Sequence, residues 1–156
     1  VHAYSGQMWS ASLTLPTMKL TAARQWTAWL TSLRGQYGSF LLGDTSCCQI
    51  SGTATSASVT GVAGDNTVTV TSNGTILAGD MIQIGSASDA TLHKVLADQS
   101  GNGSLEIWPA LRKVRTAAAL TLTNAKGAFR LASNEVSWSV DEANIYGVSF
   151  SAVEKI

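Results

Sequence analysis

Two neighbouring cysteines and one histidine are the residues of this sequence that could carry out covalent chemistry. Cys47 or Cys48 could supply a thiol nucleophile. His93 could activate that thiol as a general base, with Asp98 orienting the imidazole ring. No local sequence motif supports this arrangement, and the chain has two histidines in all. We therefore expect cysteines that are buried or lie in a loop, in a protein that is not an enzyme.

The same cysteines, together with His2 and His93, are also the residues that could bind a transition metal. Apart from the adjacent cysteine pair, no two of them show the spacing that is typical of zinc ligands. We therefore expect no metal and no cofactor. Adjacent cysteines rarely bond to each other because the resulting ring is strained, and the chain has no third cysteine. The pair indicates a reducing compartment or two small buried side chains.

Residues 79–85 (GDMIQIG) form the segment most like a nucleotide-binding loop. The segment lacks the lysine of a phosphate-binding loop, and no helical pattern follows it. We expect a turn that leads into a strand, closed by the side chain of Asp80.

Arg112, Lys113 and Arg115 form a basic cluster directly after Trp108. One interpretation is a solvated loop. In the other, the loop faces DNA in a channel or an acidic patch on a neighbouring subunit, with Trp108 at a subunit interface. Three cations bind duplex DNA weakly, but the same three repeated around a ring would form an electrostatic collar. These four residues are the candidate channel or interface residues.

The composition predicts a chain that associates. Its 156 residues carry a formal net charge of +0, and 13% are charged, against roughly 25% in an average soluble protein. Copies of such a chain repel one another weakly. The balance gives no reason to expect broad nucleic-acid binding. No apolar run approaches the ~20 residues of a membrane helix, and residues 1–6 do not resemble a signal peptide.

The first 43 residues predict a strand, a helix and a second strand. Residues 8–15 alternate between apolar and mostly hydroxyl side chains, and Pro16 ends the strand. A helix is expected over residues 21–34, with Thr21 as its N-cap and Gly35 in a left-handed conformation at its end. Residues 38–43 read as the second strand. One apolar stripe should place two tryptophans in the core; it consists of Ala22, Trp26, Trp29, Leu30 and Leu33.

The rest of the chain predicts β-structure. Residues 58–62 and 67–71 alternate on either side of an Ala-Gly-Asp-Asn turn, which is typical of a hairpin. Further short strands follow up to about residue 122, as in a small barrel or sandwich. Strands at 127–131, 136–140 and 145–153 should pair with the N-terminal strand and the Phe40 region.

The predicted fold class is therefore mainly β: an antiparallel β-sandwich with one amphipathic α-helix and an inserted small β-barrel. The core sandwich would comprise residues 1–50 and 123–156, with the helix over 21–34. The inserted barrel would comprise residues 51–122.

Two regions of the sequence resemble a known family. The run WSASLTLP, the Ala- and Trp-rich helix, SLRGQYGSFLLGD and the C-terminal run GAFRLASNEVSWSVDEANIYGVSFSAVE are similar to small tail proteins of long-tailed bacteriophages. The nearest functional type is the distal-tail or tail-tip ring protein. The chain departs from this pattern at residues 45–48 (TSCC), where a proline-containing turn would be expected.

This resemblance implies a structural subunit of a virion, made in the host cytoplasm. It implies a homo-oligomer, specifically a hexameric ring, that connects the tail tube to the tip proteins and leaves a channel for DNA. Non-specific contact with that DNA, and no contact with a membrane, would follow.

A carbohydrate-binding β-sandwich for host recognition is the alternative function. It would use exposed aromatic rings, and the chain has five tryptophans. Of these, Trp108 and Trp138 could equally lie at a subunit interface. This alternative predicts a shallow groove lined by Trp or Tyr on a monomer. The ring interpretation predicts a discrete oligomer with a large buried interface.

Overall fold

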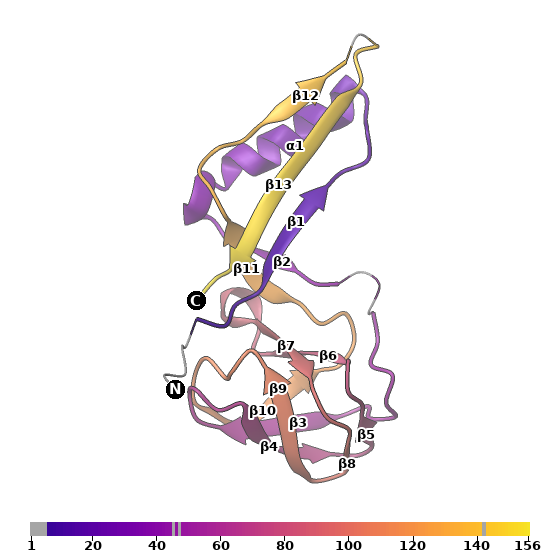
Figure 1. Ribbon diagram of the computed structural model, residues 1–156, viewed down its shortest axis with the longest axis vertical. Helices are drawn as coiled ribbons and strands as arrows, with labels where there is room; N and C mark the ends of the chain where they lie inside the picture. The colour runs from indigo at the N-terminus through magenta and orange to yellow at the C-terminus, as the bar shows by residue number, and fades with distance from the viewer. Residues whose placement is uncertain (1–5, 45, 47, 142) are drawn as a thin grey trace. The chain divides into compact units, whose positions relative to one another are not determined.

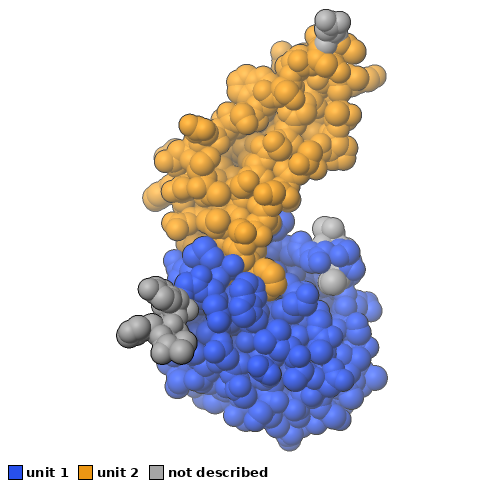
Figure 2. Space-filling model, viewed as in Figure 1, with its two compact units in different colours: residues 1–8, 41–128, 156 blue, residues 9–40, 129–155 orange. Residues whose placement is uncertain are grey.

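The chain folds into two compact units in the computed structural model, which describes residues 6–44, 46, 48–141 and 143–156 (Figures 1 and 2). The barrel unit consists of residues 1–8, 41–128 and 156, and the helix–sheet unit of residues 9–40 and 129–155. The chain passes between the units within strands β2 (Phe40–Leu42) and β11 (Gly127–Leu131).

The helix–sheet unit is built on strand β13 (Tyr146–Glu154). All five residues of β1 (Ser10–Thr14) pair with residues 149–153 of β13. The sheet order is β1-β13-β11-β2, and β12 (Trp138–Val140) also pairs with β13. Leu13 lies opposite Phe150 in the antiparallel register. The predicted pairing of the C-terminal strands with the N-terminal strand and the Phe40 region is confirmed for β13 and β11, whereas β12 pairs with β13 alone in the described part of the chain.

Helix α1 (Leu20–Ser32) begins one residue earlier and ends two residues earlier than predicted. Its N-cap is Lys19, without a side-chain capping bond, so the prediction of Thr21 as N-cap is wrong. The cause is an isolated β-bridge between Met18 and Tyr146, which ends the extended segment directly before the helix. Gly35 has the predicted left-handed conformation, with φ +67°, and begins the 3-10 helix η1 (Gly35–Tyr37).

Helix α1 forms the second layer of this unit, where a second sheet was expected. Leu30 and Leu33 are buried against Leu131 and Val148. Trp29 packs edge-on against Phe40 and Phe150, with ring centroids 5.2 and 5.9 Å apart. Along β13, buried Val148 and Ala152 alternate with exposed Ser149 and Ser151, so one face of the strand is covered, as its pattern predicted.

The prediction that Trp26 belongs to the core is wrong, since it is 37% exposed. Its ring meets Trp29 edge-on at 5.6 Å. Trp29 therefore lies between Trp26 and the two phenylalanines, and Trp26 lies at the edge of the buried face of the helix.

The barrel unit holds a closed antiparallel barrel with the strand order β10-β3-β4-β9-β7-β6. Its strands are β3 (Ala57–Gly61), β4 (Thr67–Ser72), β6 (Met81–Ile84), β7 (Thr91–Val95), β9 (Gly103–Trp108) and β10 (Arg115–Thr121). A short pair, β5 (Thr75–Ile76) with β8 (Gln99–Ser100), and the 3-10 turn η2 (Ala87–Asp89) complete the unit. The predicted hairpin is confirmed as β3 and β4, with Ser58 opposite Thr71.

Alternating residues of these strands fill the barrel interior. Ile82, Ile84, Leu105 and Ile107 are fully buried, together with Val70. Because a closed barrel pairs every strand on both sides, it leaves no open sheet edge of its own. The predicted fold class, mainly β with one helix and a small barrel, is confirmed.

Truncation of one interior leucine should unfold the barrel more readily than truncation of an exposed one. Leu105→Ala removes a fully buried side chain and should cost about 2–5 kcal/mol of unfolding free energy. Leu96 is 46% exposed, so Leu96→Ala is the matched control and should stay within about 0.5 kcal/mol of the parent. Urea titration followed by circular dichroism measures both. Equal losses in the two variants would contradict the assignment of the core.

Candidate functional site

The candidate base His93 lies in the barrel interior with both ring nitrogens in hydrogen bonds. Its Nδ1 is 2.8 Å from the carbonyl oxygen of Pro109, and its Nε2 is 2.9 Å from the Thr91 hydroxyl. The Asp98 carboxylate instead accepts the N–H of Ala78 at 2.8 Å, next to β5. Cys48 is exposed. The structure thus gives His93 and Asp98 separate structural partners.

The metal-binding hypothesis named two further residues, His2 and Cys47, which lie outside the described residues. Among the residues that the structure describes, no three or more His, Cys, Asp and Glu side chains gather in a way that could hold a metal ion. No helix in this part of the chain is long and apolar enough to cross a membrane.

Asp80 closes the turn before β6, as predicted. Its carboxylate accepts the N–H of Leu77 at 2.8 Å, and its own N–H donates to the Leu77 carbonyl. The same carboxylate also accepts the N–H of Ser51 at 2.6 Å. The prediction missed this second contact, because residues 51 and 80 come together through the barrel alone.

Two cations of the basic cluster share one carboxylate. Lys113 Nζ lies 2.5 Å from Asp89 Oδ1, and Arg115 Nη1 lies 2.8 Å from Asp89 Oδ2. Arg115 also donates to the Asp89 carbonyl at 3.3 Å. We call these three residues the Asp89 bracket; it ties the turn between β6 and β7 to the segment that enters β10. Hydrogen bonds from Lys113 first, and then from Arg115, hold the pKa of the Asp89 carboxyl below its usual value.

The remaining candidate residues also have contacts inside the barrel unit. Arg112 donates through Nη2 to the carbonyl oxygen of Gln7. Gln7 accepts the N–H of Ala110 through its side chain at 3.0 Å. Trp108 is half-buried at the end of β9. Lys113, with 65% of its side chain exposed, is more accessible than Arg115, with 13%.

This geometry gives the basic cluster an internal role. Asp89 offsets part of the positive charge that a bound polyanion would otherwise meet. Sequence reasoning missed Asp89, because it lies 24 residues before Lys113 and meets it through the pairing of the barrel strands.

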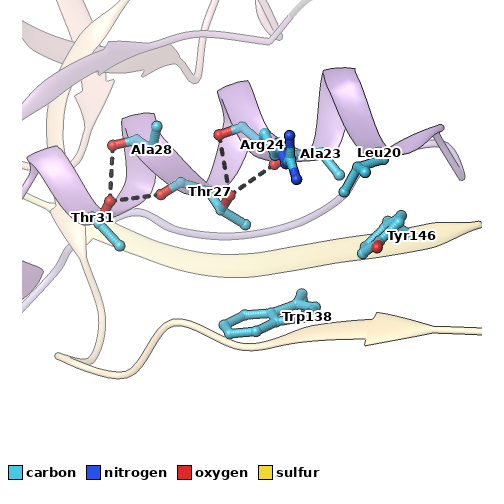
Figure 3. Close-up of a pocket in the computed structure, with 8 residues that line it drawn as sticks. All are labelled: Leu20, Ala23, Arg24, Thr27, Ala28, Thr31, Trp138 and Tyr146. Atoms are coloured by element: carbon cyan, nitrogen blue, oxygen red, sulfur yellow. Dashed lines mark hydrogen bonds between the residues drawn. The ribbon is translucent and has the colours of Figure 1, made fainter.

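A groove lies between α1 and β12 in the helix–sheet unit (Figure 3). Its volume is about 440 Å³. Trp138 and Tyr146 lie opposite the helix. We call it the α1–β12 groove; its lining residues are Leu20, Ala23, Arg24, Thr27, Ala28, Thr31, Trp138 and Tyr146.

Apart from Arg24, the helical wall of this groove is apolar although it contains two threonines. Thr27 donates its hydroxyl hydrogen toward the carbonyls of Ala23 and Arg24, at 2.9 and 3.2 Å. Thr31 does the same toward Thr27 and Ala28, at 2.8 and 3.0 Å. Because both hydroxyl hydrogens turn to the helix backbone, these side chains have no hydroxyl hydrogen left to donate to a ligand in the groove.

Exposed apolar side chains occur in the groove and in the adjoining β12–β13 segment. Trp138 is 61% exposed, an unusual state for the largest apolar side chain. Val140, Leu20 and Ile145 are also exposed. The sequence marked Trp138 as a possible interface residue, but the groove was not predicted, since it arises where a helix and a strand distant in sequence come together.

A second hollow on the same unit is polar. It lies along β13, has a volume of about 530 Å³ and includes the hydroxyl groups of Ser12, Thr14, Ser149 and Ser151. Glu135 also lines it.

The sheet of this unit also has open edges. β1 ends the sheet on one side, and β12 pairs with β13 and with no other strand in the described part of the chain. Open edges offer unpaired backbone N–H and C=O groups to another chain.

The sequence matches no protein-family model, and a search of curated proteins likewise gives no match.

Loss of the Asp89 charge should weaken the barrel in a pH-dependent way. In Asp89→Asn both ion pairs are lost, at a cost of at most about 1 kcal/mol, because the carboxylate is partly exposed and water screens it. The folded-state pKa lies below the ordinary value of 3.8, so the bracket stabilises the fold above that pH. This contribution is lost as the pH falls through the folded-state pKa.

Chemical denaturation from pH 7 down to pH 2.5 compares the parent protein with the variant. The two stability curves should converge at the acid end. Curves separated by the same amount at every pH would show that the Asp89 charge does not contribute.

Proposed function

We propose that this chain is a structural subunit of the tail of a long-tailed bacteriophage, forming a ring at the distal tail or tail tip. Residues 9–40 and 129–155, which form the helix–sheet unit, largely coincide with the segments that resemble tail proteins. The observation that carries the proposal is the exposed apolar surface of this unit around Trp138. Such a surface is typical of a site that another protein covers.

In this proposal the ring is held together by burial of apolar surface. Copies with a formal net charge of +0 approach one another with little repulsion. The open edges of β1 and β12 can add backbone hydrogen bonds between copies. The ring would be a hexamer that joins the tail tube to the tip proteins, in virions assembled from subunits made in the host cytoplasm.

The basic cluster has a secondary place in this proposal. Lys113 is the cation best exposed to DNA in a channel or to an acidic neighbour, while Arg115 mainly stabilises the barrel. Trp108 is half-buried and would contribute to an interface through its exposed part.

The mass of the assembled particle tests the ring directly. Native mass spectrometry and sedimentation velocity of the purified chain should give a discrete oligomer, with six copies expected. Quantitative mass spectrometry of intact particles should give the same copy number per tail. A monomer at every concentration, or absence of the chain from purified tails, would contradict the proposal.

One feature favours the alternative, a carbohydrate-binding module. The α1–β12 groove has Trp138 and Tyr146 in its wall, and aromatic rings of this kind can stack on the apolar faces of sugars. The ring proposal places a protein in the same groove, so the two functions compete for one surface.

Glycan binding to the monomeric protein distinguishes them. If the alternative holds, a glycan array or calorimetry should detect binding that Trp138→Ala abolishes and the barrel variant Leu96→Ala retains. The ring proposal predicts no binding in either variant or in the parent. Binding of a sugar by the monomer at micromolar affinity would favour the alternative.

A further inference from the structure

We propose that the turn between β12 and β13 of one copy docks into the α1–β12 groove of a second copy. This inference rests on the proposed function, because it names the contact that would join the subunits. The described residues of the turn are Asp141 and residues 143–145.

The groove is suited to an apolar group flanked by a carboxylate. Arg24 is the charged residue among those that line it. Lys19 directly precedes the helix, and residues 1–43 contain no Asp or Glu that could neutralise these cations within that segment. An occupant with an apolar group and a carboxylate would therefore complement the groove.

The β12–β13 turn offers both chemical features. Ile145 is 38% exposed and the preceding strand residue Val140 is 48% exposed, so apolar groups flank the turn on both sides. Asp141 is exposed and supplies the carboxylate. The turn thus complements the groove in charge and in hydrophobic character.

Asp141 also has hydrogen bonds to described residues of the turn. The Asp141 carboxylate accepts the N–H groups of Ala143 and Ile145, at 3.0 and 2.8 Å. The Asp141 N–H donates to the Ile145 carbonyl at 3.1 Å. These hydrogen bonds restrain Asp141 and Ile145, which reduces the conformational entropy that these two residues lose on docking.

The chain cannot place this turn in its own groove. Val140 pairs with Tyr146 at the base of the turn, and Tyr146 itself lines the groove. β12 and β13 thus pair directly next to the turn and also border the groove. This pairing holds the turn outside the groove of its own copy. A second copy supplies the same segment without that restriction. If each copy gives its turn to the next one in a single direction, the contact builds a ring when the rotation between copies closes, and an open filament when it does not.

Sedimentation velocity of the full chain over a concentration series, with three groove or turn variants, tests this contact. Trp138→Ala should weaken association roughly 30-fold, as is typical of a central interface tryptophan. Arg24→Gln and Asp141→Asn should each weaken it about fivefold, typical of an exposed ion pair at an interface rim. The amide oxygen introduced by Asp141→Asn can still accept the two turn hydrogen bonds, so this variant removes the charge alone.

The double variant Arg24→Gln/Asp141→Asn provides the sharpest comparison. If the two charges meet across the interface, the double variant should associate no more weakly than either single variant. Arg130→Gln and Asp98→Asn are matched controls at exposed positions outside the groove, and both should leave association unchanged. Thermal unfolding of each variant verifies that it is folded.

The outcomes distinguish the occupant, the groove and the ring from one another. The turn is not the occupant if the losses of association from Arg24→Gln and Asp141→Asn multiply in the double variant, or if neither variant has an effect. This conclusion holds even if Trp138→Ala weakens association. An oligomer unaffected by all three single variants would overturn the groove as the interface and leave the proposed ring intact. A parent protein that stays monomeric would overturn both.

Discussion

The packing of α1 on β13 is the interaction on which the helix–sheet unit depends. The sheet has one apolar face, and the helix is what covers it. Leu30 and Leu33 supply the buried contact with Val148, and Trp29 extends that contact to Phe150. Without this layer the face of β13 would be open to water, at a cost of about 25 cal/mol for each Å² of apolar surface.

The same packing leaves a gap between the helix and β12. Beside Leu20 and Arg24, the helix lines this gap with small side chains such as Ala23, Thr27 and Ala28. Small side chains cannot reach Trp138, so the indole ring remains uncovered on the helix side. The groove and the exposed indole ring of Trp138 thus both follow from the small side chains on this face of the helix.

The barrel is stable by other means. Its interior is apolar, and two aspartates fix its loops: Asp80 through backbone N–H groups, and Asp89 through Lys113 and Arg115. The basic cluster therefore has a structural explanation that needs no nucleic acid.

The sequence allowed much of the local structure to be predicted. The β3–β4 hairpin followed from strict alternation around an Ala-Gly-Asp-Asn turn, and the one-sided character of β13 followed from its apolar and hydroxyl pattern. The start of α1 was misplaced because the bridge from Met18 to Tyr146 is a tertiary contact. The exposure of Trp26 was missed for a related reason, since helical spacing alone does not show how wide a covering sheet is.

The candidate site was less predictable. Trp138 and Lys113 could be named from their types and neighbours, but their partners could not. The groove needs α1 to lie beside β12, more than 100 residues later in the chain, and the Asp89 bracket needs the closed barrel.

Hydrogen–deuterium exchange above and below the association concentration tests most directly whether another copy covers the surface around Trp138. Peptides that span residues 20–31 and 138–146 should become protected as the concentration rises, while barrel peptides such as 103–108 stay unchanged. Equal exchange of the helix and β12 peptides at both concentrations, in a protein that has associated, would contradict the account.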